Sequence, residues 1–190
     1  MIKASPCRIA KTAGTFYLLT FLTGLPAFFI RSGLGVALGL IAAVCYIVVT
    51  LLFYYVFRPV NRTLSLIAML VSLAGCAIGP VSAGFHLTLQ VNPLVFFGFY
   101  CLLIGYLIFR STFLPGVLGA LMAFAGVGWL TFFSASVARR LGPYNLVPGF
   151  IGEGALTLWL LVKGVDEQQW HEQASAAAMA IGIKPSPNVR

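Results

Sequence analysis

One acidic side chain lies in the middle of an otherwise apolar segment near the end of the chain. Glu153 occupies this position between Leu146 and Lys163, and the other acids, Asp166, Glu167 and Glu172, all follow the segment. At ~1.5 Å rise per residue, a helix over this segment would place the carboxyl group well inside a hydrocarbon layer. An ionised carboxyl at that depth costs roughly 2.5–3.5 kcal/mol or more, so we expect it to face other helices and to be paired or protonated.

Three interpretations of Glu153 stay open at this point. A carboxyl group in a low-dielectric setting is favoured in its neutral form and can be switched, which is the chemistry of a proton- or cation-handling site. The same group could instead be a protonated acid that bonds a neighbouring helix and fixes the register between the two. A third interpretation is a contact with the headgroup of a lipid or apolar ligand.

Two residues near Glu153 in the sequence join it as candidates for this site. Gly149, together with Gly152 and Gly154, leaves room for another helix or a ligand to approach the carboxyl group. Thr157 follows Glu153 by one helical turn and shares its face of the helix.

Three more distant candidates are Tyr46, Tyr100 and His86. Tyr46 lies in the middle of the second apolar segment and needs a partner for its hydroxyl, which Glu153 could supply. Tyr100 and Tyr106 are six positions apart, so they do not share one helical face and at least one should pack or lie at the interface. His86 lies near a predicted membrane edge, where a histidine is more often solvated than bound to a ligand.

The sequence predicts neither a catalytic centre nor a metal site. It contains no His–acid pair at helical spacing, no Ser with a His at membrane depth, and no phosphate-binding glycine loop followed by Lys. The four cysteines, Cys7, Cys45, Cys76 and Cys101, are far apart and show no CxxC motif or Cys/His ligand spacing. We therefore expect a protein that is not an enzyme and that has no cofactor.

The composition is that of an integral membrane protein. Of the 190 residues 60% are hydrophobic and only 8% are charged, against about 25% charged in soluble domains. The net charge of +8 comes from basic residues that lie singly or in pairs at the ends of apolar segments. In such positions they set topology and contact anionic lipid. The lipid bilayer is thus the expected partner, and nucleic acid is not.

The apolar segments predict an all-α helical bundle with six transmembrane helices and short loops. Residues 1–165 would form a single six-span domain, and residues 166–190 a polar cytoplasmic tail, part of it a short helix with Trp170 at the interface. The predicted spans cover about residues 13–30, 34–57, 64–87, 93–109, 113–138 and 146–163.

The distribution of Lys and Arg predicts the orientation of these spans. Nine of the 12 basic residues fall at the termini and in the second and fourth loops, and Arg31, Arg139 and Arg140 fall on the other side. The side richer in Lys and Arg faces the cytoplasm. We therefore expect a multi-pass protein of the bacterial inner membrane with both termini in the cytoplasm.

Several stretches resemble landmarks of one known family. These are Phe99–Pro115, Phe150–Glu153 with Leu158–Gly164, and Arg58–Asn61 with Ala10–Gly14. In order and spacing they are similar to domain-of-unknown-function family 4386, mostly bacterial integral membrane proteins. The resemblance covers about residues 8–165 and implies a multi-span helical bundle, but it brings no activity.

Many members of that family carry charged or amide side chains in the second and third spans. This chain has Tyr46, Ser72 and Gly75 at those places. The difference argues against an ion pair between those spans and Glu153.

Two hypotheses for the function follow. The first is a membrane protein that binds or moves a proton or a small amphiphile at an internal site around Glu153. The second is a structural or assembly protein that packs with a partner helix or with copies of itself, in which Glu153 is a hydrogen-bonded structural residue. A cavity that reaches Glu153 would favour the first hypothesis over the second.

Overall fold

The computed structural model describes residues 5–30, 32–84 and 92–180, and the regular elements in these ranges are all helices. The predicted all-α fold is therefore confirmed for this part of the chain. The helices are α1 (Pro6–Phe29), α2 (Gly33–Phe57), α3 (Arg62–Gly84), α4 (Leu94–Arg110), α5 (Gly116–Leu130), α6 (Ala135–Leu141), α7 (Val147–Val162) and α8 (Glu167–Ala180), with short 3-10 helices η1 (Thr131–Phe133) and η2 (Gly142–Leu146) on either side of α6.

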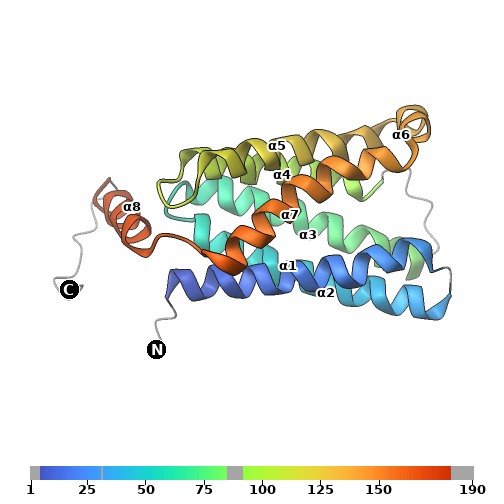
Figure 1. The fold of residues 1–190 in the computed structure, drawn as a ribbon, viewed down its shortest axis with the longest axis horizontal. Helices are drawn as coiled ribbons and strands as arrows, with labels where there is room; N and C mark the ends of the chain where they lie inside the picture. Colours follow the sequence, from blue (N-terminus) through green and yellow to red (C-terminus); the bar gives the residue numbers. More distant parts are fainter. Residues whose placement is uncertain (1–4, 31, 85–91, 181–190) are drawn as a thin grey trace.

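The longer helices form a closed ring in which each packs against the next. α1 packs on α2, α2 on α3, α3 on α4, and α4 on α5. α7 closes the ring because it contacts both α5 and α1 (Figure 1). The short helix α6 lies at one end of this bundle and α8 at the other (Figure 1).

Polar side chains fix where several of these helices begin. Ser5 Oγ accepts a hydrogen bond from the Arg8 N–H at 3.3 Å, and a proline follows Ser5 at the first helical position. α1 consequently starts well before the predicted apolar span. Asn61 Oδ1 accepts from the Leu64 N–H at 2.9 Å at the start of α3, and Asn92 Oδ1 accepts from the Leu94 N–H at 3.0 Å before α4.

Two pairs of glycines bring α4 and α5 into backbone contact. A Cβ added to Gly105 would lie 2.8 Å from the carbonyl oxygen of Gly119, and one on Gly119 would lie 2.8 Å from that of Gly105. One on Gly126 would lie equally close to the carbonyl oxygen of Gly98. Small residues at such a contact let two helices approach closely, which is how helices associate in lipid.

The fifth predicted span differs from the structure. It was expected to run to Ala138, but α5 ends at Leu130 and the short helix α6 begins only at Ala135. The break lies at Ser134, whose backbone is extended (φ −111°, ψ 113°), and α6 in turn ends at Gly142 with a positive φ of 54°. The basic pair Arg139 and Arg140 lies in the last turn of α6.

Three helical segments among the described residues are long and apolar enough to cross a membrane: Gly33–Phe57, Gly116–Phe133 and Ala135–Val162. Arg62–Ile78 and Leu94–Arg110 are apolar but shorter. Large apolar side chains also cover the outer surface of the bundle, among them Phe29, Val36, Leu158 and Val162. A soluble monomer rarely exposes so much apolar surface, so the fold is compatible with a membrane environment.

The C-terminal helix α8 is attached to the end of the bundle. The Trp170 side chain is buried, and its Nε1–H donates to the Val56 carbonyl at 2.8 Å. Gln173 accepts from the Thr112 N–H at 3.1 Å and donates to the Arg110 carbonyl at 3.1 Å. The predicted short helix is thus present, and Trp170 attaches it to the end of the bundle.

Substitution of one glycine at the α4–α5 contact tests this packing. We expect Gly105→Ala to lower the free energy of unfolding by about 1–3 kcal/mol, because its Cβ would meet backbone atoms of α5 that cannot rotate away. Gly154→Ala is the matched control, since a Cβ there meets no described atom within 4 Å. It should be neutral or stabilising by up to ~1 kcal/mol through helix propensity. SDS titration in mixed micelles measures both variants, and equal effects would contradict the contact.

Candidate functional site

Glu153 lies inside the helical ring, on the face of α7 that packs against its neighbours. The residue is only 4% exposed. Glycines on the same helix allow this position, because a Cβ on Gly152 would collide with the Leu121 carbonyl of α5 and one on Gly149 would collide with the Trp129 ring. α7 and α5 are therefore close enough for side chains of α5 to reach the carboxyl group.

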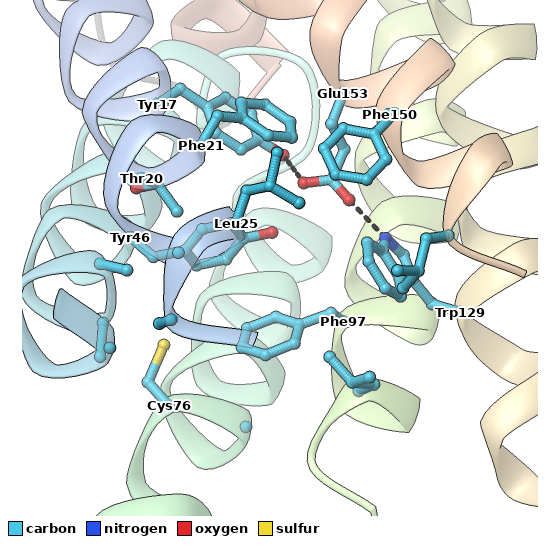
Figure 2. Close-up of a pocket in the computed structure, with 18 residues that line it drawn as sticks. Tyr17, Thr20, Phe21, Leu25, Tyr46, Cys76, Phe97, Trp129, Phe150 and Glu153 are labelled. Atoms are coloured by element: carbon cyan, nitrogen blue, oxygen red, sulfur yellow. Dashed lines mark hydrogen bonds between the residues drawn. The ribbon is translucent and has the colours of Figure 1, made fainter. Parts of the chain in front are cut away.

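Three donors from three other helices converge on this carboxyl group. The Tyr17 hydroxyl of α1 donates to Oε2 at 2.5 Å, and the Trp129 Nε1–H of α5 donates to Oε1 (Figure 2). The Cys101 thiol of α4 also donates to Oε1, at a longer distance of 3.7 Å. The expectation that Glu153 faces other helices and has partners there is met by neutral donors.

A cavity of about 380 Å³ lies beside the carboxyl group (Figure 2). This volume is within the range of small-molecule pockets, roughly 300–1,000 Å³. Apart from Glu153, the lining is mostly apolar, and the described residues that line it include no basic side chain. The lining residues are Tyr17, Thr20, Phe21, Gly24, Leu25, Ala27, Gly39, Ala42, Ala43, Tyr46, Gly75, Cys76, Leu94, Phe97, Trp129, Leu146, Phe150 and Glu153.

Aromatic rings in contact with one another border the cavity. Phe150 contacts Phe21 with ring centroids 5.7 Å apart, and Phe21 stacks on Tyr17 at 5.7 Å. Tyr17 packs edge-to-face on Tyr46 at 5.5 Å, and Tyr46 on Phe97 at 4.9 Å. Figure 2 shows Trp129 and Phe150 on the other side of the space from Tyr46. The carboxyl group therefore shares its cavity with six aromatic rings.

Of the predicted residues, Tyr46 lines the cavity and Gly149 lies against the Trp129 ring. Tyr46 lines the cavity, but its hydroxyl has no hydrogen-bond partner among the described residues and is not bonded to Glu153. Figure 2 shows this hydroxyl turned toward the cavity. The Trp129 ring of α5 fills the space left by the missing side chain of Gly149.

The other predicted residues contribute less. The Thr157 hydroxyl donates to the backbone carbonyl of Glu153 at 2.7 Å, so it does not reach the carboxyl group. A Cβ on Gly154 would meet no described atom within 4 Å, so no described neighbour packs against this glycine. Tyr100 is buried behind the Tyr46 ring, with centroids 5.9 Å apart, and is not part of the lining. His86 lies outside the described residues.

Sequence reasoning missed all three donors to Glu153. Tyr17 carried a signal, because it is a phenol inside the first apolar segment and such a hydroxyl needs a partner. Trp129 and Cys101 carried none, since tryptophan is common at membrane interfaces and a buried cysteine behaves as a small apolar residue.

Comparison with known proteins places this bundle in a family. The family described as "Domain of unknown function (DUF4386)" matches residues 83–164. An uncharacterized protein of Archaeoglobus fulgidus is 30% identical over 129 residues, which is 62% of this chain and 76% of that protein. The chain belongs to the DUF4386 family. No solved structure matches it.

The match to DUF4386 covers only part of the site. It includes Glu153 and two of its donors, Cys101 and Trp129. Tyr17 and Tyr46 precede the matched residues. The family region therefore supplies the acid, and the first two helices of this chain supply the phenols around it.

Two tyrosine-to-phenylalanine substitutions separate the bonded phenol from the unbonded one. Tyr17→Phe should lower the free energy of unfolding by about 1–3 kcal/mol, because it removes a donor to a buried carboxyl group. Tyr46→Phe should be neutral or stabilising, because it removes a buried hydroxyl that has no partner among the described residues. Tyr106→Phe, at an exposed position, is the control. Equal losses for Tyr17→Phe and Tyr46→Phe in SDS titration would refute the assignment.

Proposed function

We propose that this protein is a multi-pass protein of the cell membrane that binds or moves a proton or a small amphiphile at Glu153. One observation carries the proposal: the Glu153 carboxyl group borders a cavity whose lining is otherwise mostly apolar. Such a cavity accepts an apolar body, and a single carboxyl group beside it accepts a proton or a polar head.

The helices support the membrane part of the proposal. α1, α2, α3, α4, α5 and α7 lie at the six predicted spans, and three helical segments are long enough to cross a bilayer. Apolar side chains on the outer surface would face lipid. In this arrangement lipid offers the Glu153 carboxyl group no hydrogen-bond partner, so the group has to be satisfied inside the bundle.

The basic residues support the proposed orientation. Six of them lie at helix ends on the α8 side of the bundle, and Arg139 and Arg140 lie in α6 at the opposite end (Figure 1). The six are Arg8, Lys11, Arg58, Arg62, Arg110 and Lys163. Because Lys and Arg accumulate on the cytoplasmic side, the α8 end and both termini would face the cytoplasm.

The chemistry of the site suits reversible proton binding. Low polarity around Glu153 stabilises the neutral acid, whereas the Tyr17 and Trp129 donors stabilise the carboxylate. Each form of the carboxyl group thus has a physical reason to exist in the same pocket. We propose binding or transport, and no catalytic reaction.

A second candidate function is structural. Glu153 on α7 bonds donors on α1, α4 and α5, which is the arrangement expected of a residue that fixes helix register. In this alternative the protein packs with a partner helix or with copies of itself, and the cavity has no ligand.

Glu153→Gln distinguishes the two functions while keeping the side-chain shape. In proteoliposomes loaded with the pH-sensitive dye pyranine, wild type should equilibrate protons after a pH step faster than Glu153→Gln. For an amphiphile site, a small molecule found by mass spectrometry in solvent extracts of purified wild type should fall at least about tenfold in the variant. Glu172→Gln, at an exposed acid of α8, is the control. If both readouts are unchanged in Glu153→Gln, the structural alternative holds.

Reporter fusions test the orientation. Green fluorescent protein fused after Arg190 should fluoresce, and alkaline phosphatase at the same point should be inactive, because this end is proposed to be cytoplasmic. Alkaline phosphatase inserted after Arg140 should be active, because α6 is proposed to lie on the opposite side. The reverse pattern would invert the topology.

A further inference from the structure

We propose that the occupant of the cavity is a hydrophobic protonated amine that exchanges with the proton of Glu153. This inference rests on the proposed function and names the class of its ligand. It draws on three features of the cavity that are independent of each other: its charge, its aromatic lining and the unbonded hydroxyl of Tyr46.

The charge of the site favours a cation. In the described part of the chain, the titratable groups near Glu153 on the packed helices are Tyr17 of α1, Tyr46 of α2 and Cys101 of α4, with Tyr100 of α4 behind the Tyr46 ring. Phenols and thiols are ordinarily neutral at physiological pH. Cys76 of α3 also lines the cavity, whereas the α5 contribution, Trp129, does not titrate. Among the described residues, Glu153 is therefore the group at the cavity that can carry charge, and that charge is negative.

The aromatic lining also favours a positively charged ligand. Rings of Tyr17, Phe21, Tyr46, Phe97, Trp129 and Phe150 border the cavity. The face of an aromatic ring attracts a cation, and the attraction is stronger when water is excluded. An anionic amphiphile such as a fatty acid would be repelled by these ring faces and could form no ion pair with Glu153 in either protonation state.

The Tyr46 hydroxyl adds a place for an N–H group. The Tyr46 side chain is buried, its hydroxyl has no partner among the described residues, and Figure 2 shows this hydroxyl turned toward the cavity. A buried polar group without a partner is costly. An ammonium group has three donors and no acceptor, so it can donate to the Tyr46 oxygen and to the Glu153 carboxylate together.

Exchange with the proton keeps the interior neutral. Without ligand the neutral acid lies in the cavity; with ligand the O–H bond of the carboxyl group breaks, the proton leaves to water, and a carboxylate–ammonium pair takes its place. No electrons are transferred, and one positive charge enters for each that leaves. Each state is neutral overall, which matters because an unpaired charge in a low-dielectric interior is strongly disfavoured.

The test uses three probes with the same aromatic tail and different heads: phenethylamine, 2-phenylethanol and phenylacetate. Isothermal titration of the full chain in detergent micelles should show phenethylamine binding at least about tenfold tighter than 2-phenylethanol, and no phenylacetate binding. Affinity for the amine should rise as the pH rises, because protons compete for the same carboxyl group. Titration in two buffers of different ionisation enthalpy should show a proton released on binding.

Two variants and one control complete the test. Glu153→Gln should abolish amine binding and its pH dependence, while Glu172→Gln should behave as wild type. Phe97→Leu, which keeps the carboxyl group and its donors, should weaken the amine more than the alcohol because it removes one ring face.

The outcomes separate this inference from the proposed function. Equal binding of amine and alcohol, both lost in Glu153→Gln, would overturn the cation preference and leave an amphiphile site in place. Amine binding without pH dependence or proton release would overturn the exchange. If no probe binds and Glu153→Gln also leaves proton movement unchanged, the inference and the proposed function both fail.

Discussion

A carboxyl group buried without a cation must be satisfied by hydrogen bonds, and this requirement organises the bundle. Glu153 on α7 receives donors from α1, α4 and α5. Loss of one donor would leave the Glu153 carboxyl group with one hydrogen bond fewer in a region of low polarity, where an unsatisfied polar group is strongly destabilising. The relative positions of four helices are consequently tied to one side chain.

Glycines make that convergence sterically feasible. Gly152 lets α7 lie against the backbone of α5, and Gly149 admits the Trp129 ring that bonds the carboxyl group. The Gly105–Gly119 contact holds α4 beside α5, so that Cys101 of α4 also reaches the acid. Close backbone approach is therefore a condition of the hydrogen bonding at the site as well as of the packing.

The cavity exists because small side chains gather on one side of the ring interior. Gly24 and Ala27 of α1, Gly39 and Ala42 of α2, and Gly75 of α3 all border it. Beside Glu153 the bordering side chains are large and in mutual contact, as in the Tyr17–Tyr46 pair. The carboxyl group thus has hydrogen-bond donors from three helices and also borders a mostly apolar cavity.

The sequence by itself determined the helical segments and the presence of one acidic side chain within the apolar ones. A long apolar segment between basic residues forms a helix in a membrane, because lipid offers its backbone N–H and C=O groups no partner outside the segment. The acid in the last of these segments was recognisable because lipid-facing helices rarely tolerate one. The end of α5 at Leu130 could not be predicted in this way. The backbone is extended at Ser134, where the chain turns back toward α7, and the residue composition does not indicate this turn.

Only the tertiary structure decided which groups surround the acid. Helical periodicity placed Thr157 on the face of Glu153, but its hydroxyl bonds its own backbone, as Thr commonly does in helices. Tyr17 is 136 positions away from Glu153 and Cys101 is 52. Their meeting depends on α7 closing the ring between α5 and α1, which is a matter of how helices pack. Local sequence sets a helix and its faces, whereas the choice of neighbour is a property of the whole bundle.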